Sequence, residues 1–131
     1  MQLKNYSQQY MDIYFMDIYS FSHISHGIIL YYIFRYIQID ILNGLYLTII
    51  LEFLWEMFEN TDYIINKYRK NYKNYRGDSN INIFGDIIST IIGYLFAYNL
   101  PYTSIIYLIL SELLLIPYKA SLFQLSVGSL I

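Results

Sequence analysis

Four apolar segments, each close to the length that spans a bilayer, dominate this chain of 131 residues. They cover about residues 21–39, 41–60, 80–98 and 102–116. A helix needs roughly 20 apolar residues to cross the hydrocarbon core of a membrane. Only 14% of the residues are charged, whereas a soluble domain usually carries about 25%. The sequence therefore predicts an all-α integral membrane bundle of four transmembrane helices.

The two ends of the chain differ from these segments. Residues 1–20 mix polar and aromatic side chains, and we expect them to form an interfacial N-terminal arm, because aromatic rings favour the head-group level. Residues 21–131 then form the transmembrane helical domain. Within it, residues 118–131 are apolar again and predict a short fifth helix, which either crosses the membrane or lies along it.

The basic residues predict the orientation of the bundle. Five of the eight lie in the loop between the second and third segments: Lys67, Arg69, Lys70, Lys73 and Arg76. Because positively charged loops stay on the inner side, both termini are expected inside as well. The same five side chains are candidate ligands for anionic lipid head groups. The chain has no cysteine, which excludes disulfides and thiolate metal sites, and no basic stripe that would indicate a nucleic-acid partner.

Ionisable and amide side chains interrupt the first three apolar segments at one predicted depth. The candidate polar cluster consists of His23, His26, Glu52, Glu56, Glu59, Asp78, Asn82 and Asp86. Within each segment these residues are three or four apart, so they share one helix face. A charged side chain at the centre of a bilayer costs about 2.5–3.5 kcal/mol on insertion scales. We therefore expect the three polar faces to meet one another rather than lipid.

Three interpretations of the cluster remain open. The first is a metal centre with His23, His26, Glu56 and Asp78 as candidate ligands, although the Glu-x-x-His motif of di-iron bundles is absent. In the second, Glu56 or Asp78 is a general acid or base in an enzyme that acts on a lipid-linked head group, within a water-filled cavity. The third is a structural network in which the acids pair with imidazoles, amides, Arg69 and Arg76. No catalytic residue or cofactor is assigned.

Several of these residues also form a familiar pattern. The matching segments are Phe21-Ser22-His23-Ile24-Ser25-His26-Gly27, Trp55-Glu56-Met57-Phe58-Glu59-Asn60-Thr61, Ile64-Ile65, Tyr68-Arg69 and Gly77-Asp78-Ser79, followed by Asn82, Asp86, Gly93 and Ala97. This pattern resembles an uncharacterised family of alphaproteobacterial inner-membrane proteins and, more loosely, VanZ-like membrane proteins. The resemblance covers about residues 20–98 and implies a membrane protein of four to five helices without a known activity. Ala120-Ser121-Leu122 stands where the family tends to have an Arg-Asp-Asn turn.

The amino-acid composition suggests which kind of genome encodes the chain. Ile, Tyr and Phe are abundant, whereas Ala occurs twice and Val once, although all of these suit a membrane helix. A bias towards A and T in the codons explains this choice. Together with the alphaproteobacterial resemblance, it predicts a mitochondrially encoded protein of the inner membrane, ahead of a bacterial inner-membrane protein. The expected function is an accessory, non-catalytic subunit of a respiratory-chain complex, with membrane lipids and other subunits as partners.

Overall fold

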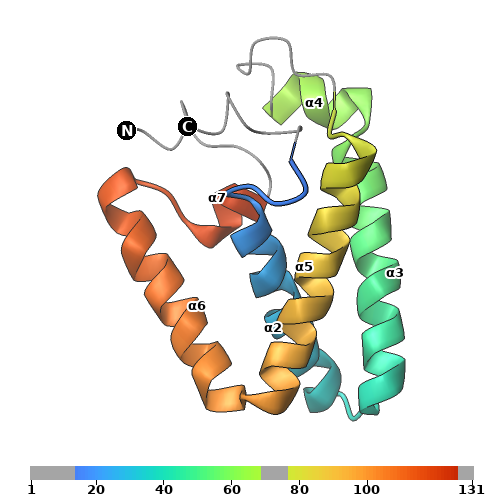
Figure 1. Cartoon of the computed structure of the whole chain (residues 1–131), viewed down its shortest axis with the longest axis vertical. Helices are drawn as coiled ribbons and strands as arrows, with labels where there is room; N and C mark the ends of the chain where they lie inside the picture. The colour runs from blue at the N-terminus through green and yellow to red at the C-terminus, as the bar shows by residue number, and fades with distance from the viewer. Residues whose placement is uncertain (1–13, 69–76, 127–131) are drawn as a thin grey trace.

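The computed structural model describes residues 14–68 and 77–126, and these are helical without a strand (Figure 1). The helices are α2 (Ser20–Tyr36), α3 (Ile41–Glu59), α4 (Asp62–Tyr68), α5 (Asn80–Asn99), α6 (Pro101–Leu115), the 3₁₀ helix η1 (Ile116–Tyr118) and α7 (Leu122–Ser126). The prediction of an all-α protein is confirmed. The short α7 lies within the region where a fifth, C-terminal helix was predicted.

Three helical segments of the described chain are long and apolar enough to cross a membrane, by length and composition alone. They are Ile41–Glu59, Asn80–Asn99 and Pro101–Tyr118, the last of which joins α6 to η1. The fourth predicted crossing corresponds to α2, which has 17 residues and is not one of the three. Most residues of its first two turns are serines and histidines. The predicted count of four crossings is therefore not reached by this criterion.

Helices α2, α3 and α5 lie side by side, with α5 against both of the others (Figure 1). Helix α6 follows α5 through a tight turn and leans away from the bundle towards its other end, where α7 contacts both α2 and α6. The start of α2, the end of α3 and the start of α5 lie at one end of the bundle, together with α4 and α7. The ends of the helices that carry the polar residues are thus gathered at that end.

Two of the long helices begin at side chains that cap them. Asp40 accepts a hydrogen bond from the backbone N–H of Asn43 (3.0 Å) at the start of α3. Ser79 accepts one from the N–H of Asn82 (3.2 Å) at the start of α5. Pro101 occupies the first turn of α6, where its missing N–H costs nothing. These caps fix where the polar faces of α3 and α5 begin.

Small residues bring α2 and α5 into backbone contact. A Cβ atom on Gly27 of α2 would lie 1.9 Å from the carbonyl oxygen of Thr90, and one on Gly93 of α5 would lie 1.9 Å from that of Ile24. Gly85, Ser89, Gly93 and Ala97 repeat every four residues along α5 and are all buried. Such spacing allows close packing between membrane helices, where apolar side chains give no hydrophobic drive to association.

The buried face of α3 is polar and its outer face is apolar. Its buried residues are Gly44, Thr48, Glu52, Glu56 and Glu59. The exposed ones include Leu47, Ile50, Leu51, Phe53 and Leu54. In water this distribution would be unfavourable, whereas in a bilayer it leaves apolar side chains towards lipid and polar ones towards protein. The burial pattern therefore agrees with a membrane location.

The segment before α2 packs against α5. Gly85 approaches the backbone of Phe15 so closely that a Cβ on the glycine would lie 1.7 Å from the Phe15 carbonyl oxygen. The side-chain amide of Asn82 donates to the carbonyl of Tyr14 (2.8 Å). Residues 1–13, most of the predicted interfacial arm, lie outside the described part of the chain.

Candidate functional site

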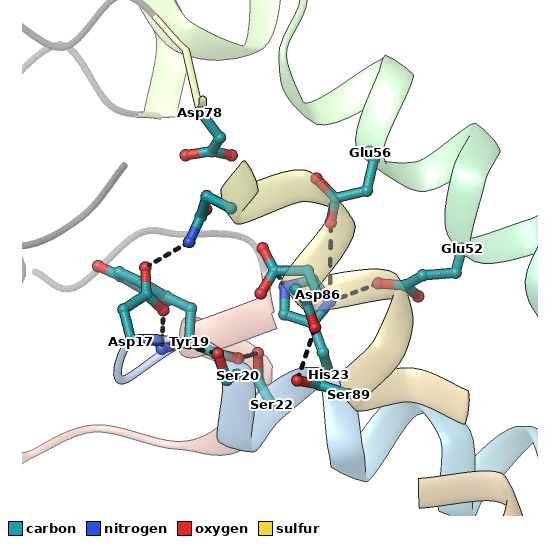
Figure 2. A network of polar contacts seen from close by, with 12 residues as sticks. Asp17, Tyr19, Ser20, Ser22, His23, Glu52, Glu56, Asp78, Asp86 and Ser89 are labelled. Carbon is teal, nitrogen blue, oxygen red and sulfur yellow. Dashed lines mark hydrogen bonds and ion pairs between the residues drawn. The ribbon is translucent and has the colours of Figure 1, made fainter. Parts of the chain in front are cut away.

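The structure brings most of the candidate polar cluster together between α2, α3 and α5 (Figure 2). Six of its members each expose no more than 4% of their surface: His23, Glu52, Glu56, Glu59, Asn82 and Asp86. His26 is partly buried, with 19% of its side chain exposed. The acids come from one face of α3 and from α5, and both imidazoles come from the first two turns of α2.

His23 lies at the centre of the acids (Figure 2). Its Nδ1 is hydrogen-bonded to Glu52 Oε1 and lies 3.7 Å from Glu56 Oε1. Its Nε2 faces Asp86 Oδ2 at 3.5 Å. One imidazole therefore contacts carboxylates from two helices, and both of its ring nitrogens are directed at acids.

His26 is held by a hydrogen bond to α7. Its Nε2 lies 2.7 Å from Ser126 Oγ, whose own hydroxyl donates to the carbonyl of Leu122 (2.8 Å). With the serine proton directed at Leu122, the serine oxygen is an acceptor for an N–H at Nε2 of His26. The other nitrogen, Nδ1, lies 3.4 Å from Glu52 Oε2.

Glu52 therefore has an imidazole nitrogen beside each of its two oxygens. A neutral His26 would direct the lone pair of Nδ1 towards an oxygen of Glu52, which is unfavourable when the carboxylate is ionised and buried. A cation at this point removes the repulsion. It is either a proton between the ring nitrogen and the carboxyl group, or a metal ion bound by the nitrogen and the carboxylate together.

Ligand atoms of these side chains lie close enough to bind one ion. Within the described residues, two groups have one ligand atom of each member within 4.8 Å of the others: His23, His26 and Glu52, and His23, Glu56 and Glu59. Nitrogen and oxygen ligands of this kind suit Zn²⁺, Fe²⁺ and Mn²⁺. Of the four metal ligands considered from the sequence, Asp78 is in neither group.

Asp86 adds a further acid to the same interior. Its Oδ1 is buried and has no hydrogen-bond partner among the described residues, while its Oδ2 faces His23. A ligand-binding imidazole usually donates its second N–H to a carboxylate or another oxygen, which orients the ring. Asp86 stands in that position for His23, as Ser126 does for His26.

A second group of contacts involves Asp78 and Asn82, and Asp78 lies nearer to the end of the bundle (Figure 2). The backbone N–H of Asp78 donates to Asn60 Oδ1 (2.7 Å). The side-chain amide of Asn82 donates to Asp17 Oδ2 (3.2 Å). Burial raises the pKa of the Asp17 carboxyl above its ordinary value, while hydrogen bonds from Tyr19 and Asn82 oppose this shift. These contacts attach the segment before α2 to the start of α5.

Of the five candidate ligands for lipid head groups, only Lys67 lies in the described part of the chain. It is exposed at the end of α4, and its Nζ donates to the hydroxyl of Tyr63 (3.1 Å). Arg69, Lys70, Lys73 and Arg76 lie outside the described residues, as does their predicted pairing with the acids.

Two cavities border the cluster at His26. One, of about 350 Å³, lies between α2, α3 and α7 and reaches Glu52; the other, of about 470 Å³, lies between α2, α6 and α7 and reaches Glu112. Neither is lined by His23, Glu56 or Asp78. The enzyme hypothesis required a single cavity lined by these three residues and His26. The two cavities do not have that lining, because His23 and Glu56 are enclosed by the helices.

Two contributors were missed from the sequence. Ser126 lies one hundred residues after His26 and carries no local signal, since a serine near an apolar end is common. Asp17 was treated as part of the N-terminal arm, although its position directly before a helix of serines and histidines indicates a helix start. Glu112 of α6 accepts a hydrogen bond from the N–H of Leu122 (3.0 Å) and so holds α7.

Comparison with known proteins identifies relatives of this chain. The sequence profile of the family described as "Protein of unknown function (DUF2585)" matches residues 2–127. A UPF0314 protein of Brucella anthropi is 39% identical over 89 residues, which are 65% of this chain and 45% of the relative. UPF0314 proteins of Sphingopyxis alaskensis (39% over 85 residues; 62% and 45%) and Paracoccus denitrificans (35% over 89 residues; 65% and 46%) are also similar. The chain aligns with less than half the length of these relatives. No solved structure matches it.

These relatives correct the predicted source and function. They are proteins of alphaproteobacteria, so the prediction of a mitochondrially encoded subunit of a respiratory-chain complex, with a part in electron transport, is wrong. A shortage of Ala and Val reports the base composition of a genome and not a compartment, since a bacterium rich in A and T would show the same bias. The relatives do not favour the lipid-linked head-group enzyme either. The part of the resemblance that holds is the uncharacterised alphaproteobacterial family.

Proposed function

The chain belongs to the DUF2585 family, and on this basis we propose that it is a bacterial inner-membrane protein that binds a divalent transition-metal ion between α2 and α3. The ligands are Nδ1 of His23, Nδ1 of His26 and the carboxylate of Glu52. Glu56 Oε1 lies 3.7 Å from His23 Nδ1 and is not one of these three ligands. A looser relation to VanZ-like proteins remains a prediction.

One observation carries the metal proposal. Two imidazoles present Nδ1 to the same carboxylate, while an oxygen faces Nε2 of each ring: Ser126 at His26 and Asp86 at His23. This is the pattern of imidazole ligands whose orientation is set by outer hydrogen bonds. The absence of cysteine in the whole chain favours Zn²⁺ or Fe²⁺ over Cu⁺, which prefers sulfur ligands.

Metal binding is testable on the purified protein. We expect about one Zn²⁺ ion per chain after equilibrium dialysis, measured by elemental analysis. His26→Gln and Glu52→Gln each remove a ligand and should weaken binding by at least about 100-fold, because even outer partners of a ligand contribute 10–100-fold. Asp62→Asn is the matched control, since Asp62 is exposed on α4 and outside both ligand groups.

The same dialysis distinguishes a metal ion from protons. If protons alone neutralise Glu52, wild-type protein and the two ligand variants will retain the same small amount of Zn²⁺ as Asp62→Asn. That result would overturn the proposed site and leave a structural network of ion pairs in its place.

For the membrane arrangement we propose four crossings, with α2 as the fourth and both termini in the cytoplasm. The 17 residues of α2 extend for about 25 Å, near the thickness of the hydrocarbon core. Its polar residues are tolerated because they face α3 and α5 instead of lipid. Helix α4 lies at the end of the bundle that holds the cluster, and the basic loop comes directly after α4 in the sequence. The positive-inside rule therefore favours the cytoplasm for that end.

Cysteine labelling tests this orientation directly, since the chain has no cysteine of its own. A cysteine introduced by Lys67→Cys should react with a membrane-impermeant maleimide in inverted vesicles and not in intact spheroplasts. Tyr102→Cys, at the exposed start of α6, should show the opposite pattern. Labelling of both positions from the same side would contradict the proposed topology.

A further inference from the structure

The smaller of the two cavities beside the cluster combines an apolar wall with a polar end. Its volume of about 350 Å³ lies within the range of about 300–1,000 Å³ that is typical of sites for small molecules. Its apolar lining consists of Ile29, Leu30, Leu51, Trp55 and Phe123. At one end it is bounded by His26, Glu52 and Ser126. A molecule that fills this cavity would need an apolar body and a polar head.

Two of the three proposed metal ligands, His26 and Glu52, form part of the cavity wall. A metal ion bound to them would therefore have a neighbouring space that no protein atom fills. Structural metal sites in proteins are closed by four protein ligands, whereas sites that bind an external ligand keep a position open. The geometry at His26 and Glu52 corresponds to the second kind of site.

The apolar lining also reaches the outer surface of the bundle. Ile29 and Leu51 expose 44% and 43% of their surfaces, and Phe123 exposes 74%. In a membrane these side chains contact acyl chains, because α3 directs its apolar face towards lipid. The cavity is thus accessible from the lipid phase, and its occupant is a molecule that partitions into the membrane.

We propose that this cavity holds the alkyl chain of a single-chain anionic amphiphile whose oxygen-donor head group completes the coordination of the metal ion. This inference rests on the proposed metal site. The volume suits one alkyl chain better than two. An anionic head group would be repelled by Glu52 in the metal-free protein, so binding must depend on the metal. The assignment concerns binding alone and includes no reaction.

Cobalt is a spectroscopic probe for both the binding of the metal ion and the binding of the amphiphile. Co²⁺ bound by two imidazoles and a carboxylate gives absorption bands that change when a further ligand coordinates. With the full chain in lipid nanodiscs loaded with Co²⁺, we expect octanohydroxamate to shift the bands with an apparent Kd at least about tenfold lower than that of acetohydroxamate, which has the same head group and no alkyl chain.

Two variants on α3 identify the cavity as the place where the chain binds. Leu51→Trp fills the cavity from its lipid-exposed wall, so the preference for octanohydroxamate should disappear while the cobalt bands remain. Leu47→Trp is the matched control: Leu47 lies one turn earlier on α3, is 37% exposed and does not line the cavity. It should keep the preference.

The outcomes separate the two proposals. If the wild-type protein gives no cobalt bands, the metal site itself is wrong, and the inference about the cavity falls with it. If the bands are present but octanohydroxamate leaves them unchanged or extracts the cobalt, the metal site stands and the cavity inference is overturned. An equal preference for octanohydroxamate in Leu51→Trp and Leu47→Trp would overturn it as well.

Discussion

Replacing Gly93 by valine is expected to separate α2 from α5 and to abolish most of the folded protein. The first added carbon alone would lie 1.9 Å from the carbonyl oxygen of Ile24, and backbone atoms of a helix cannot move aside as a flexible side chain can. Overpacking a core usually costs about 1–3 kcal/mol. In Gly93→Val the loss of stability should reach or exceed the upper end of this range, because the interface between α2 and α5, the largest between helices, depends on this contact.

The fraction of protein that elutes as a single species in mild detergent measures this loss, together with the temperature at which that fraction falls by half. Ile92→Val is the control, since Ile92 is the neighbouring residue and half of its surface is exposed on the outside of the bundle. A Gly93→Val protein as stable as Ile92→Val would show that α2 and α5 do not pack as described.

Replacing His23 by alanine should destabilise the protein by about 3–5 kcal/mol, the usual cost of removing one partner from a buried ion pair. His23 lies between Glu52, Glu56 and Asp86, and its loss leaves neighbouring carboxylates without the group that all three contact. Equilibrium unfolding in mixed micelles measures the change in the free energy of unfolding.

A second substitution tests the electrostatic cause. In His23→Ala/Glu52→Gln, one of the uncompensated charges is removed, so the double variant should recover part of the stability that the single variant loses. If the double variant is less stable than His23→Ala, the cost comes from the cavity left by the ring and not from the acids. His26→Gln alone should have a smaller effect, since His26 is only partly buried.

The positions of the helices were predictable because breaks in an apolar sequence are strong signals. The second and third segments, predicted at residues 41–60 and 80–98, form α3 (Ile41–Glu59) and α5 (Asn80–Asn99). One pair of residues gives a misleading signal. Asn43-Gly44 is typical of turns, but Gly44 lies inside α3, where a Cβ would be 2.3 Å from the hydroxyl of Tyr94. Close packing and a turn both favour glycine, and the sequence alone does not distinguish them.

Helical spacing predicted which polar side chains share a helix face. It did not predict which residues they contact. Spacings of three and four residues place His23 with His26 and Glu52 with Glu56 on single faces, and the structure brings those faces together. Spacing does not say which groups of neighbouring segments lie at the same depth, so the contacts of Asp78 with Asn60 and of Asn82 with Asp17 had no signal in the sequence. Ser126 reaches His26 only through the turn after α6, a tertiary contact without a sequence signature.

Helix α3 buries its polar face and exposes its apolar face, which affects how the stability of the bundle depends on temperature. When helices of this kind separate inside a bilayer, their outer leucines and isoleucines stay in contact with acyl chains and meet little new water. The heat capacity of such a separation is therefore small, because that quantity arises mainly from hydrating apolar surface. The bundle should consequently lose little of its cohesion in the cold, in contrast to a water-soluble domain of the same size.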